Sequence, residues 1–230
     1  LYNGNAIENI GRGFQRIELG EPIGIFYGYN SLGVDPSTGD LVFEDVNKDG
    51  EIDVEDKKRI GSPHALVHGG FLNNFSYRNF ELNIFLQYSY GNDVFNGTRR
   101  YIESMKDANN QTTAILNRWR KPGDVTDMPR ATNADPNENN RVSSRFVEDG
   151  SYLKIKTIRF SYTFSNKINN AIGIEQLQLY FLGQNLFTLT NFSGMDPEVN
   201  YAGDDVIRSG VEFFTYPPAK IYSVGLTIQF

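Results

Sequence analysis

Several features that define common protein classes are missing from this chain. It contains no cysteine, which excludes disulfides, thiol catalysis and cysteine-type zinc sites. No run of about 18 apolar residues occurs, so the sequence predicts no membrane-spanning helix. The net charge is −6 and no basic block or stripe is present, which argues against nucleic-acid binding. The chain begins at Leu1 without the charged and apolar regions of a signal peptide, so we expect either a mature form or a piece of something longer.

Recognisable catalytic motifs are missing as well. The sequence has no G-x-S-x-G, Walker A or dinucleotide-binding fingerprint. His64 and His68 are the only histidines, and they lie four residues apart on a segment with a strand-like pattern. At the rise of a strand, such positions are about 13 Å apart, too far for one metal ion. The sequence therefore predicts no catalytic residue and no enzymatic activity.

Aromatic residues are abundant by contrast, with 13 Tyr and 17 Phe against an overall hydrophobic content of 39%. Alternating apolar and polar residues predict five long strands of 11 to 13 residues. This length is close to the roughly 9–11 residues that cross a bilayer at a tilt. The last strand places Tyr222, Val224, Leu226, Ile228 and Phe230 on one side. The predicted strands span residues 66–77, 80–90, 152–164, 176–188 and 219–230.

The segment 152–164 gives the most specific indication of how such strands face their surroundings. Its apolar residues fall on odd positions up to Ile155 and on even positions from Ile158, which predicts a β-bulge near Thr157. With that slip, the basic residues Lys154, Lys156 and Arg159 lie opposite the apolar face. A basic side chain facing lipid at the bilayer midplane costs about 2–4 kcal/mol. The pattern therefore favours an all-β fold, an antiparallel transmembrane β-barrel segment with a wet interior.

The connections between the predicted strands alternate in length, as in outer-membrane barrels with short periplasmic turns and long outer loops. Only Arg78 and Asn79 join the first two strands, and a short Asn-rich turn, 166–173, joins the middle pair. We expect residues 30–63 and 92–151 to be long extracellular loops, with 190–218 forming another. Short helices are predicted within residues 99–105 and 112–120.

One segment carries a strong ion-binding motif. Oxygen-bearing side chains occupy loop positions 1, 3, 5, 9 and 12, with Gly50 at position 6 and Ile52 at position 8, as in an EF-hand calcium loop. Asp56 stands where the usual loop has Glu, which predicts weaker or differently shaped binding. A solvated turn without an ion is the alternative. The predicted ligands of a structural Ca²⁺ are Asp45, Asn47, Asp49, Glu51 (through its carbonyl), Asp53 and Asp56.

An ordered series of segments also resembles one protein family. It includes residues 20–28, the calcium motif followed by 59–63, residues 71–80 and 144–156, and then 183–188, 195–198 and 216–218. Together these segments resemble the C-terminal part of SusC/RagA-type TonB-dependent outer-membrane transporters of the Bacteroidetes. The resemblance runs from about Gly20 to Phe230, nearly the whole of residues 1–230.

This resemblance implies the C-terminal strands of a large barrel of about 22 strands in the cell outer membrane. It also implies a SusD-like surface lipoprotein as partner, a TonB complex that acts through an N-terminal region absent here, and a glycan or peptide as substrate. The chain departs from the family pattern because it lacks the plug and most strands. Any transport would therefore belong to a larger parent protein.

Two questions stay open at the level of sequence. Four aromatic residues of the long loops, Tyr101, Trp119, Tyr201 and Phe213, are candidate contacts for the substrate or partner, but packing within the loops would explain them equally well. The whole chain has an alternative interpretation too. A soluble, calcium-braced β-sandwich acting as a surface binding module would bury Phe80, Ile84, Leu86, Leu226 and Ile228 in its own core.

Overall fold

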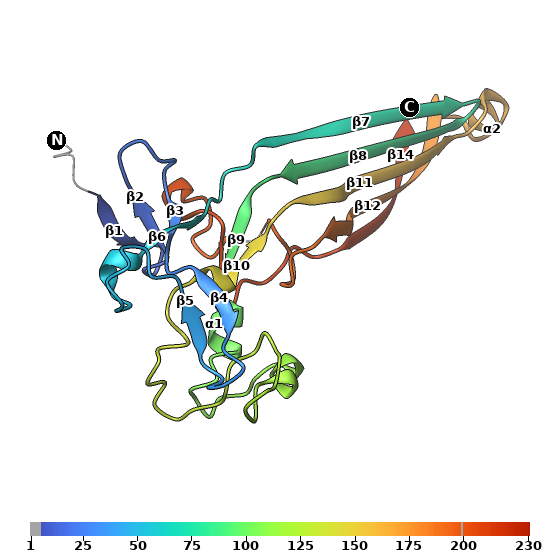
Figure 1. Cartoon of the computed structure of the whole chain (residues 1–230). Helices are drawn as coiled ribbons and strands as arrows, with labels where there is room; N and C mark the ends of the chain where they lie inside the picture. The colour runs from blue at the N-terminus through green and yellow to red at the C-terminus, as the bar shows by residue number, and fades with distance from the viewer. Residues whose placement is uncertain (1–5, 199) are drawn as a thin grey trace. The chain divides into compact units, whose positions relative to one another are not determined.

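The chain folds as two compact units, each built from three separate stretches of sequence (Figure 1). The structure is a computed structural model that describes residues 6–198 and 200–230. Residues 65–91, 151–191 and 217–230 form what we call the sheet unit, and residues 1–64, 92–150 and 192–216 form the loop unit. No helix of the described part of the chain is long and apolar enough to cross a membrane.

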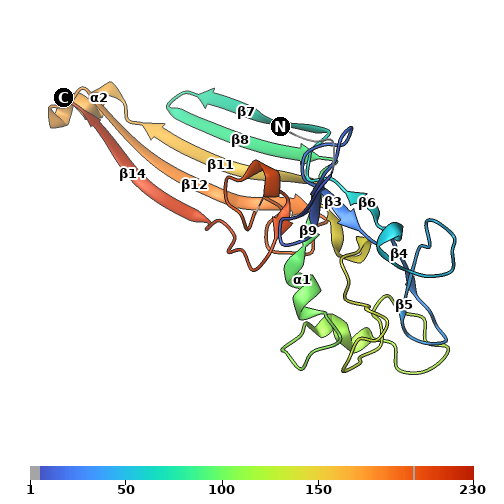
Figure 2. The ribbon, with the colours of Figure 1, turned by 90° about the vertical axis from the view of Figure 1, so that its left-hand side faces the viewer.

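The sheet unit consists of one antiparallel sheet of five strands, which lie side by side in Figures 1 and 2. All five strands predicted from alternation are confirmed, and their order in the sheet is β14-β12-β11-β8-β7. The segment 166–173, expected to be a turn, instead contains a short helix, α2 (Asn166–Ile172), which ends at Gly173 with φ 75°. The strands are β7 (Val67–Tyr77), β8 (Phe80–Tyr90), β11 (Tyr152–Thr163), β12 (Gln176–Thr190) and β14 (Ile221–Gln229).

The pairing register carries the apolar residues of each strand into rows that cross the whole sheet. Residues directly opposite each other in neighbouring strands share a face, so each row is a property of one face. One such row consists entirely of large apolar side chains, and the next row toward the β7–β8 hairpin has the same character. The two rows are Phe75, Leu82, Phe160, Phe181 and Val224, followed by Tyr77, Phe80, Tyr162, Leu179 and Leu226.

The opposite face of the sheet is mainly polar. Arg159 lies in a row with Asn83 and Ser223, and Leu182 of the same row is an apolar exception. Arg159 donates a hydrogen bond of 2.9 Å to Gln178. The predicted bulge is confirmed, because the pairing of β11 with both neighbouring strands shifts between Ile155 and Thr157. With this shift Lys154 and Arg159 lie on the same, polar face, opposite Gln87 and Asn83 of β8.

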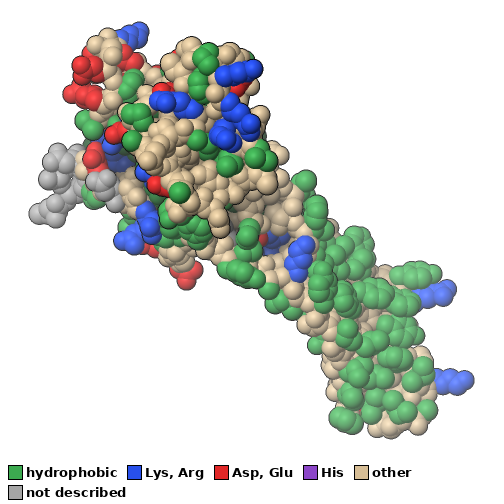
Figure 3. Space-filling view, turned by 90° about the horizontal axis from the view of Figure 1, so that it is seen from below, with side chains coloured by type: hydrophobic (Ala, Val, Ile, Leu, Met, Phe, Trp, Pro, Cys, Tyr) green, Lys and Arg blue, Asp and Glu red, His purple; other side chains and the backbone are tan. Residues whose placement is uncertain are grey.

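The sandwich alternative is contradicted by the exposure of the residues that would form its core. The sheet unit contains a single sheet, and no second layer covers its apolar face within the described residues of that unit. Val224 is 74% exposed and Leu226 62% exposed. Figure 3 shows hydrophobic side chains gathered over the strands of this unit. A face of this kind is stable only against an apolar environment.

The loop unit contains most of the buried core. Its short strands form a four-stranded sheet, β1-β2-β3-β6, a three-stranded sheet, β10-β9-β13, and the hairpin β4–β5. Strand β13 is parallel to β9, and the other pairs are antiparallel. The strands are β1 (Ile7–Ile10), β2 (Gln15–Ile17), β3 (Ile25–Gly28), β4 (Ser31–Val34), β5 (Leu41–Phe43), β6 (Lys58–Gly61), β9 (Asp93–Asn96), β10 (Val147–Asp149) and β13 (Val211–Glu212).

Helical turns in the loop unit are short. The helix α1 (Gly97–Ile102) begins at the Asn96 side chain, which accepts a hydrogen bond from the backbone N–H of Arg99. Asn is a preferred residue at such a cap. The helices predicted within 99–105 and 112–120 correspond to α1 and to a 3₁₀ turn. The 3₁₀ turns are Val54–Asp56, Thr113–Asn117, Ser144–Phe146 and Val206–Arg208.

The core of the loop unit joins segments that the sequence analysis treated as separate loops. Phe14 and Phe95 stack with their ring centroids 4.2 Å apart, and Phe26, Phe146 and Val211 are buried in the same cluster. A second, smaller cluster contains Tyr29, Leu41 and Phe43. Residues 30–63 and 92–151 are therefore not independent loops. They share one core with Phe14 and Phe26. Their position outside the cell stays a prediction.

Two neighbouring residues of β14 test the assignment of the sheet faces. Val224 and Ser223 are both exposed and point to opposite faces. Val224→Arg is expected to destabilise the protein in a phospholipid bilayer by about 2–4 kcal/mol if its face meets hydrocarbon. The measurement is the fraction of vesicle-reconstituted protein that remains folded on an unheated SDS gel. Ser223→Arg is the matched control and should change this fraction little; equal losses in both variants would contradict the assignment.

Candidate functional site

The segment 45–56 forms a tight loop in which side-chain oxygens hold the backbone. The carboxylate of Asp45 accepts hydrogen bonds from the backbone N–H of Lys48, at 2.6 Å, and of Gly50, at 2.9 Å. Asp49 accepts one from the N–H of Glu51. Gly50 has φ 88°, a left-handed conformation that glycine adopts readily. The alternating oxygens of the motif are thus placed on one tight turn.

The Asp56 side chain lies inside this loop and joins its two ends by hydrogen bonds. It is fully buried, and its two carboxylate oxygens accept hydrogen bonds from the backbone N–H of Val46, at 2.7 Å, and of Asp53, at 2.9 Å. These bonds hold the pKa of Asp56 below its usual range, the bond from Asp53 being the largest cause. Ile52, at position 8 of the motif, packs against the cluster of Tyr29, Leu41 and Phe43. The loop is therefore anchored to the core at one side chain.

The carboxylates among the predicted calcium ligands bond to the backbone of their own loop in the structure. Among the residues that the structure describes, no three His, Cys, Asp or Glu side chains are grouped closely enough to hold a metal ion. The carboxylates of Asp45, Asp49 and Asp56 are instead turned toward backbone N–H groups. Calcium binding by this loop stays a prediction.

The four aromatic residues proposed as contacts differ in their surroundings. Phe213 and Tyr201 pack against the buried cluster of the loop unit, and the guanidinium of Arg12 lies 3.9 Å from the centroid of the Phe213 ring. The Trp119 indole donates a hydrogen bond of 2.9 Å to the carbonyl of Pro36. Tyr101 alone is half exposed, with its ring edge-on to Phe214. Packing within the loop unit accounts for the first three.

A polar network joins the two predicted extracellular segments. Arg130 donates two hydrogen bonds to the carboxylate of Asp40, at 2.7 and 3.0 Å. Asn139 donates to Asp40 and accepts from the backbone N–H of Leu41. Burial alone would raise the pKa of Asp40, but the hydrogen bonds from Arg130 and Asn139 outweigh it and lower that pKa. The network holds residues 30–63 to residues 92–151 by charge-assisted bonds.

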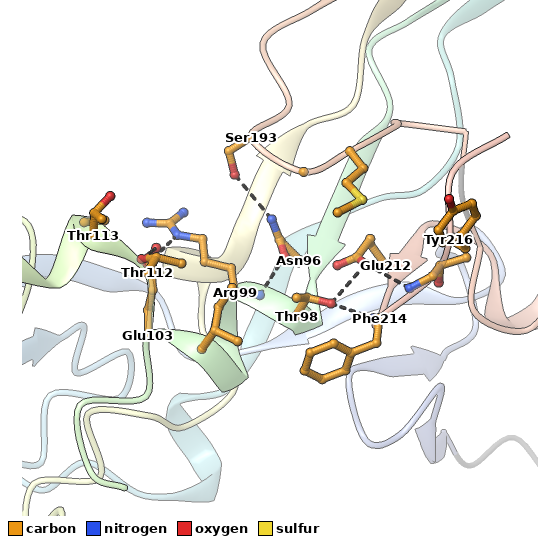
Figure 4. A pocket seen from close by; sticks show the side chains of 15 residues that line it. Asn96, Thr98, Arg99, Glu103, Thr112, Thr113, Ser193, Glu212, Phe214 and Tyr216 are labelled. Carbon is orange, nitrogen blue, oxygen red and sulfur yellow. Dashed lines mark hydrogen bonds and ion pairs between the residues drawn. The ribbon is translucent and has the colours of Figure 1, made fainter. Parts of the chain in front are cut away.

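A pocket of about 570 Å³ lies beside α1 in the loop unit, and we call it the α1 pocket (Figure 4). Its walls come from four stretches that are far apart in the sequence, and most of its lining is apolar. This volume falls in the range of small-molecule sites, roughly 300–1,000 Å³. The lining stretches are residues 96–103, 112–114, 193–195 and 212–216.

Two of the charged side chains that line the α1 pocket, Arg99 and Glu103, form an ion pair. Arg99 donates hydrogen bonds to Glu103, at 2.9 Å, and to Glu148, at 3.2 Å. Burial would lower the pKa of Arg99, but these two carboxylates raise it above its usual value. Arg145 lies close to this group, and burial, together with the charge of Arg99, lowers the pKa of Arg145 to about 10. The pocket's cation is thus neutralised within the protein.

The sequence analysis did not identify the α1 pocket. Its polar residues carry no motif, since Thr98 and Glu212 are separated by more than a hundred positions and meet only through strand β13 beside β9. Periodicity cannot indicate such a meeting, because the parallel pairing of two short strands is decided by packing.

Curated proteins that match this chain include TonB-dependent receptors. No family model matches the chain. The TonB-dependent receptor P3 of Formosa agariphila is 34% identical over 235 residues, which cover 94% of this chain and 23% of that receptor. The TonB-dependent receptor SusC of Bacteroides thetaiotaomicron is 27% identical, over 82% of this chain and 17% of its own length.

The fold is also found in a solved structure of the RagAB peptide transporter. The match has a TM-score of 0.83 at 24% identity and covers 100% of this chain and 25% of the other. At this identity the likeness shows the fold alone, and it confirms the predicted all-β class. The chain spans a quarter or less of the length of the relatives described here.

The Asp40–Arg130 network predicts a pH dependence of stability. Because the pKa of Asp40 is lowered in the folded state, its contribution is present above the unfolded pKa, about 3.9, and is lost as pH falls through the folded pKa. Asp40→Asn should therefore lower the melting temperature more at pH 6 than at pH 3. The measurement is circular dichroism melting at both pH values. Asp204→Asn, at an exposed position, is the control, and a pH-independent effect of Asp40→Asn would refute the prediction.

Proposed function

We propose that this chain, which is 34% identical to a TonB-dependent receptor over 94% of its length, forms part of the wall and outer loops of an outer-membrane importer. The sheet unit would supply the wall, with its apolar rows toward lipid and its polar face toward the interior. The loop unit, which contains residues 30–63 and 92–150, would lie on the extracellular side. The chain is not an enzyme, since its relatives are receptors and transporters.

The observation that carries this proposal is the five-stranded sheet with two unlike faces. In a lipid environment, every backbone polar group must be paired within the protein, which closed sheets of long strands achieve. Strands β14 and β7 lie at the two edges of the sheet in this chain. In the proposed importer these edges would pair with further strands of the receptor, because an unpaired edge is costly in hydrocarbon.

The substrate and partners follow from the proposed importer. We propose that the receptor acts with a SusD-like surface lipoprotein, that a TonB complex drives it, and that it carries a glycan or a peptide. The SusC relative and the structural likeness to the RagAB peptide transporter support this assignment. Most of the substrate cavity would be formed by parts of the receptor outside this chain.

Deletion of the receptor gene provides the direct test. The deletion strain is expected to lose growth on one class of nutrient, peptides or glycans supplied as the only source, and a plasmid copy should restore it. Removal of TonB should give the same loss, and a SusD-like lipoprotein should co-purify with the tagged receptor. Unchanged growth of the deletion strain on every peptide and glycan that the parent strain uses would refute the proposed import function.

We also propose that the loop 45–56 binds a structural Ca²⁺. Support comes from the spacing of oxygen side chains and from the tight turn at Gly50. To bind the ion, the carboxylates of Asp45 and Asp49 would have to turn part of their oxygens away from the backbone N–H groups. The role we expect is a brace that orders the segment between β5 and β6, and not a switch.

Calcium binding predicts a higher melting temperature of the receptor in the presence of the ion. A ligand that binds the folded state at 100 times its dissociation constant stabilises it by about 2.7 kcal/mol, so chelation should lower the melting temperature. The double variant Asp45→Asn, Asp49→Asn loses two charges and keeps one acceptor oxygen in place of two at each position, and it should no longer respond to calcium. The measurement is thermal melting with excess Ca²⁺ and with a chelator. An equal melting temperature of the unmodified receptor in both would reject the site.

A further inference from the structure

The α1 pocket contains one buried acceptor that the surrounding protein leaves unused. Glu212, at the end of β13, is only 6% exposed and lines the pocket. Its Oε1 accepts hydrogen bonds from the hydroxyl of Thr98, at 3.0 Å, and from the backbone N–H of Thr215, at 3.2 Å. Its Oε2 is buried, and no described protein group donates to it. A buried charged acceptor without a donor is more costly than a neutral one in the same state.

Other polar side chains of the pocket already have partners. Glu103 accepts from the Thr112 hydroxyl and from Arg99. Asn96 accepts from the backbone of Arg99 and donates to Ser193. Figure 4 shows these bonds around the pocket and places Glu212 beside Thr98. The free oxygen of Glu212 is therefore the acceptor toward which a ligand's donor would be drawn.

The charge of the lining favours a cationic donor. The charged residues that line the pocket are Arg99, Glu103 and Glu212, and their charges sum to −1. Arg99 does not neutralise Glu212, because its guanidinium is held by Glu103 and by Glu148. A carboxylate in a mainly apolar pocket is stabilised most strongly by a charged donor, whose hydrogen bond is about twice as strong as that of a neutral one.

The mouth of the pocket suits the apolar part of such a ligand. Phe214, Tyr216 and Met195 line the pocket and are exposed. Aromatic faces attract cations and pack against apolar stems, and the Met side chain adapts its shape to different partners. The pocket thus offers a carboxylate at depth and an apolar, aromatic rim.

We propose that the α1 pocket binds a primary ammonium group attached to an apolar or ring-shaped body, with the ammonium donating to Oε2 of Glu212. The amino end of a peptide and an amino sugar share this chemistry. As a statement about what the receptor imports, the proposal rests on the proposed function. As a statement about binding, it requires no transport.

The test uses the intact receptor in detergent and isothermal titration with two matched peptides, Phe-Gly-Gly amide and its N-acetyl form. The free amine is expected to bind at least about tenfold more tightly, the smallest ratio that a charge-assisted hydrogen bond supports. Glucosamine and maltose form the second pair of probes. Preference for glucosamine with no peptide preference would support the proposal and identify an amino sugar as the source.

Two variants test whether the preference for the amine depends on Glu212. Glu212→Gln keeps a carbonyl oxygen for Thr98 and Thr215 but replaces the free oxygen with a donor, so the preference for the amine should disappear. Glu138→Gln is the control, because Glu138 lies outside the pocket and its side chain is 70% exposed. A preference that persists in Glu212→Gln would overturn the proposal. Equal binding of the amine and acetyl forms, with equal binding of glucosamine and maltose, to the unmodified receptor would do so without any variant.

The outcome separates this proposal from the proposed function. Binding is measured at equilibrium without TonB, whereas import is measured by growth of the deletion strain. A receptor that supports growth but shows no preference in either pair of probes would refute the ammonium site alone. A receptor that binds the amine through Glu212 but whose deletion leaves growth unchanged would refute the import function alone.

Discussion

The in-register pairing of five long antiparallel strands is the constraint on which the rest of this structure depends. Register decides which side chains share a face, and a slip of one residue would move every apolar side chain of a strand to the other side. Here the register aligns Phe75, Leu82, Phe160, Phe181 and Val224 in one row across all five strands. The bulge between Ile155 and Thr157 preserves that alignment where the sequence changes phase. The apolar face and the mainly polar face of the sheet both follow from this pairing.

The loop unit is stabilised in a different way from the sheet unit. Its strands are short, and short strands have little stability of their own. The unit is therefore held by an aromatic cluster around Phe95 and by polar bridges such as Asp40–Arg130. Residues that would be disordered in isolated loops are fixed relative to each other within this unit. That order allows a pocket with defined walls to form from distant segments, as it does beside α1.

The two candidate ion or ligand sites differ in how their oxygens are used. In the loop 45–56, the carboxylates satisfy the backbone of their own turn, so an ion would compete with bonds already made. In the α1 pocket, one oxygen of Glu212 is buried and takes no bond from the described protein. A ligand there would add a hydrogen bond without breaking one. The pocket is thus the better prepared of the two for binding.

The sequence by itself determined the strands, their faces and the bulge, because alternation with a period of two is written in adjacent residues. All five long strands and the slip near Thr157 could be predicted from the local pattern of apolar and polar residues. The calcium motif is also local, yet sequence spacing could not decide where the carboxylates turn. The short helix α2 was missed because seven Asn-rich residues give no helical period.

Only the tertiary structure decided how distant segments meet. The pairing of β9 with β13, the stacking of Phe14 on Phe95 and the burial of Glu212 all depend on contacts across many intervening residues. Such contacts depend on packing and loop closure, which leave no mark in neighbouring residues. For that reason sequence alone left open whether Tyr201 and Phe213 are contacts or packing residues, and the structure packs both against the core, while the α1 pocket had no signature in the sequence.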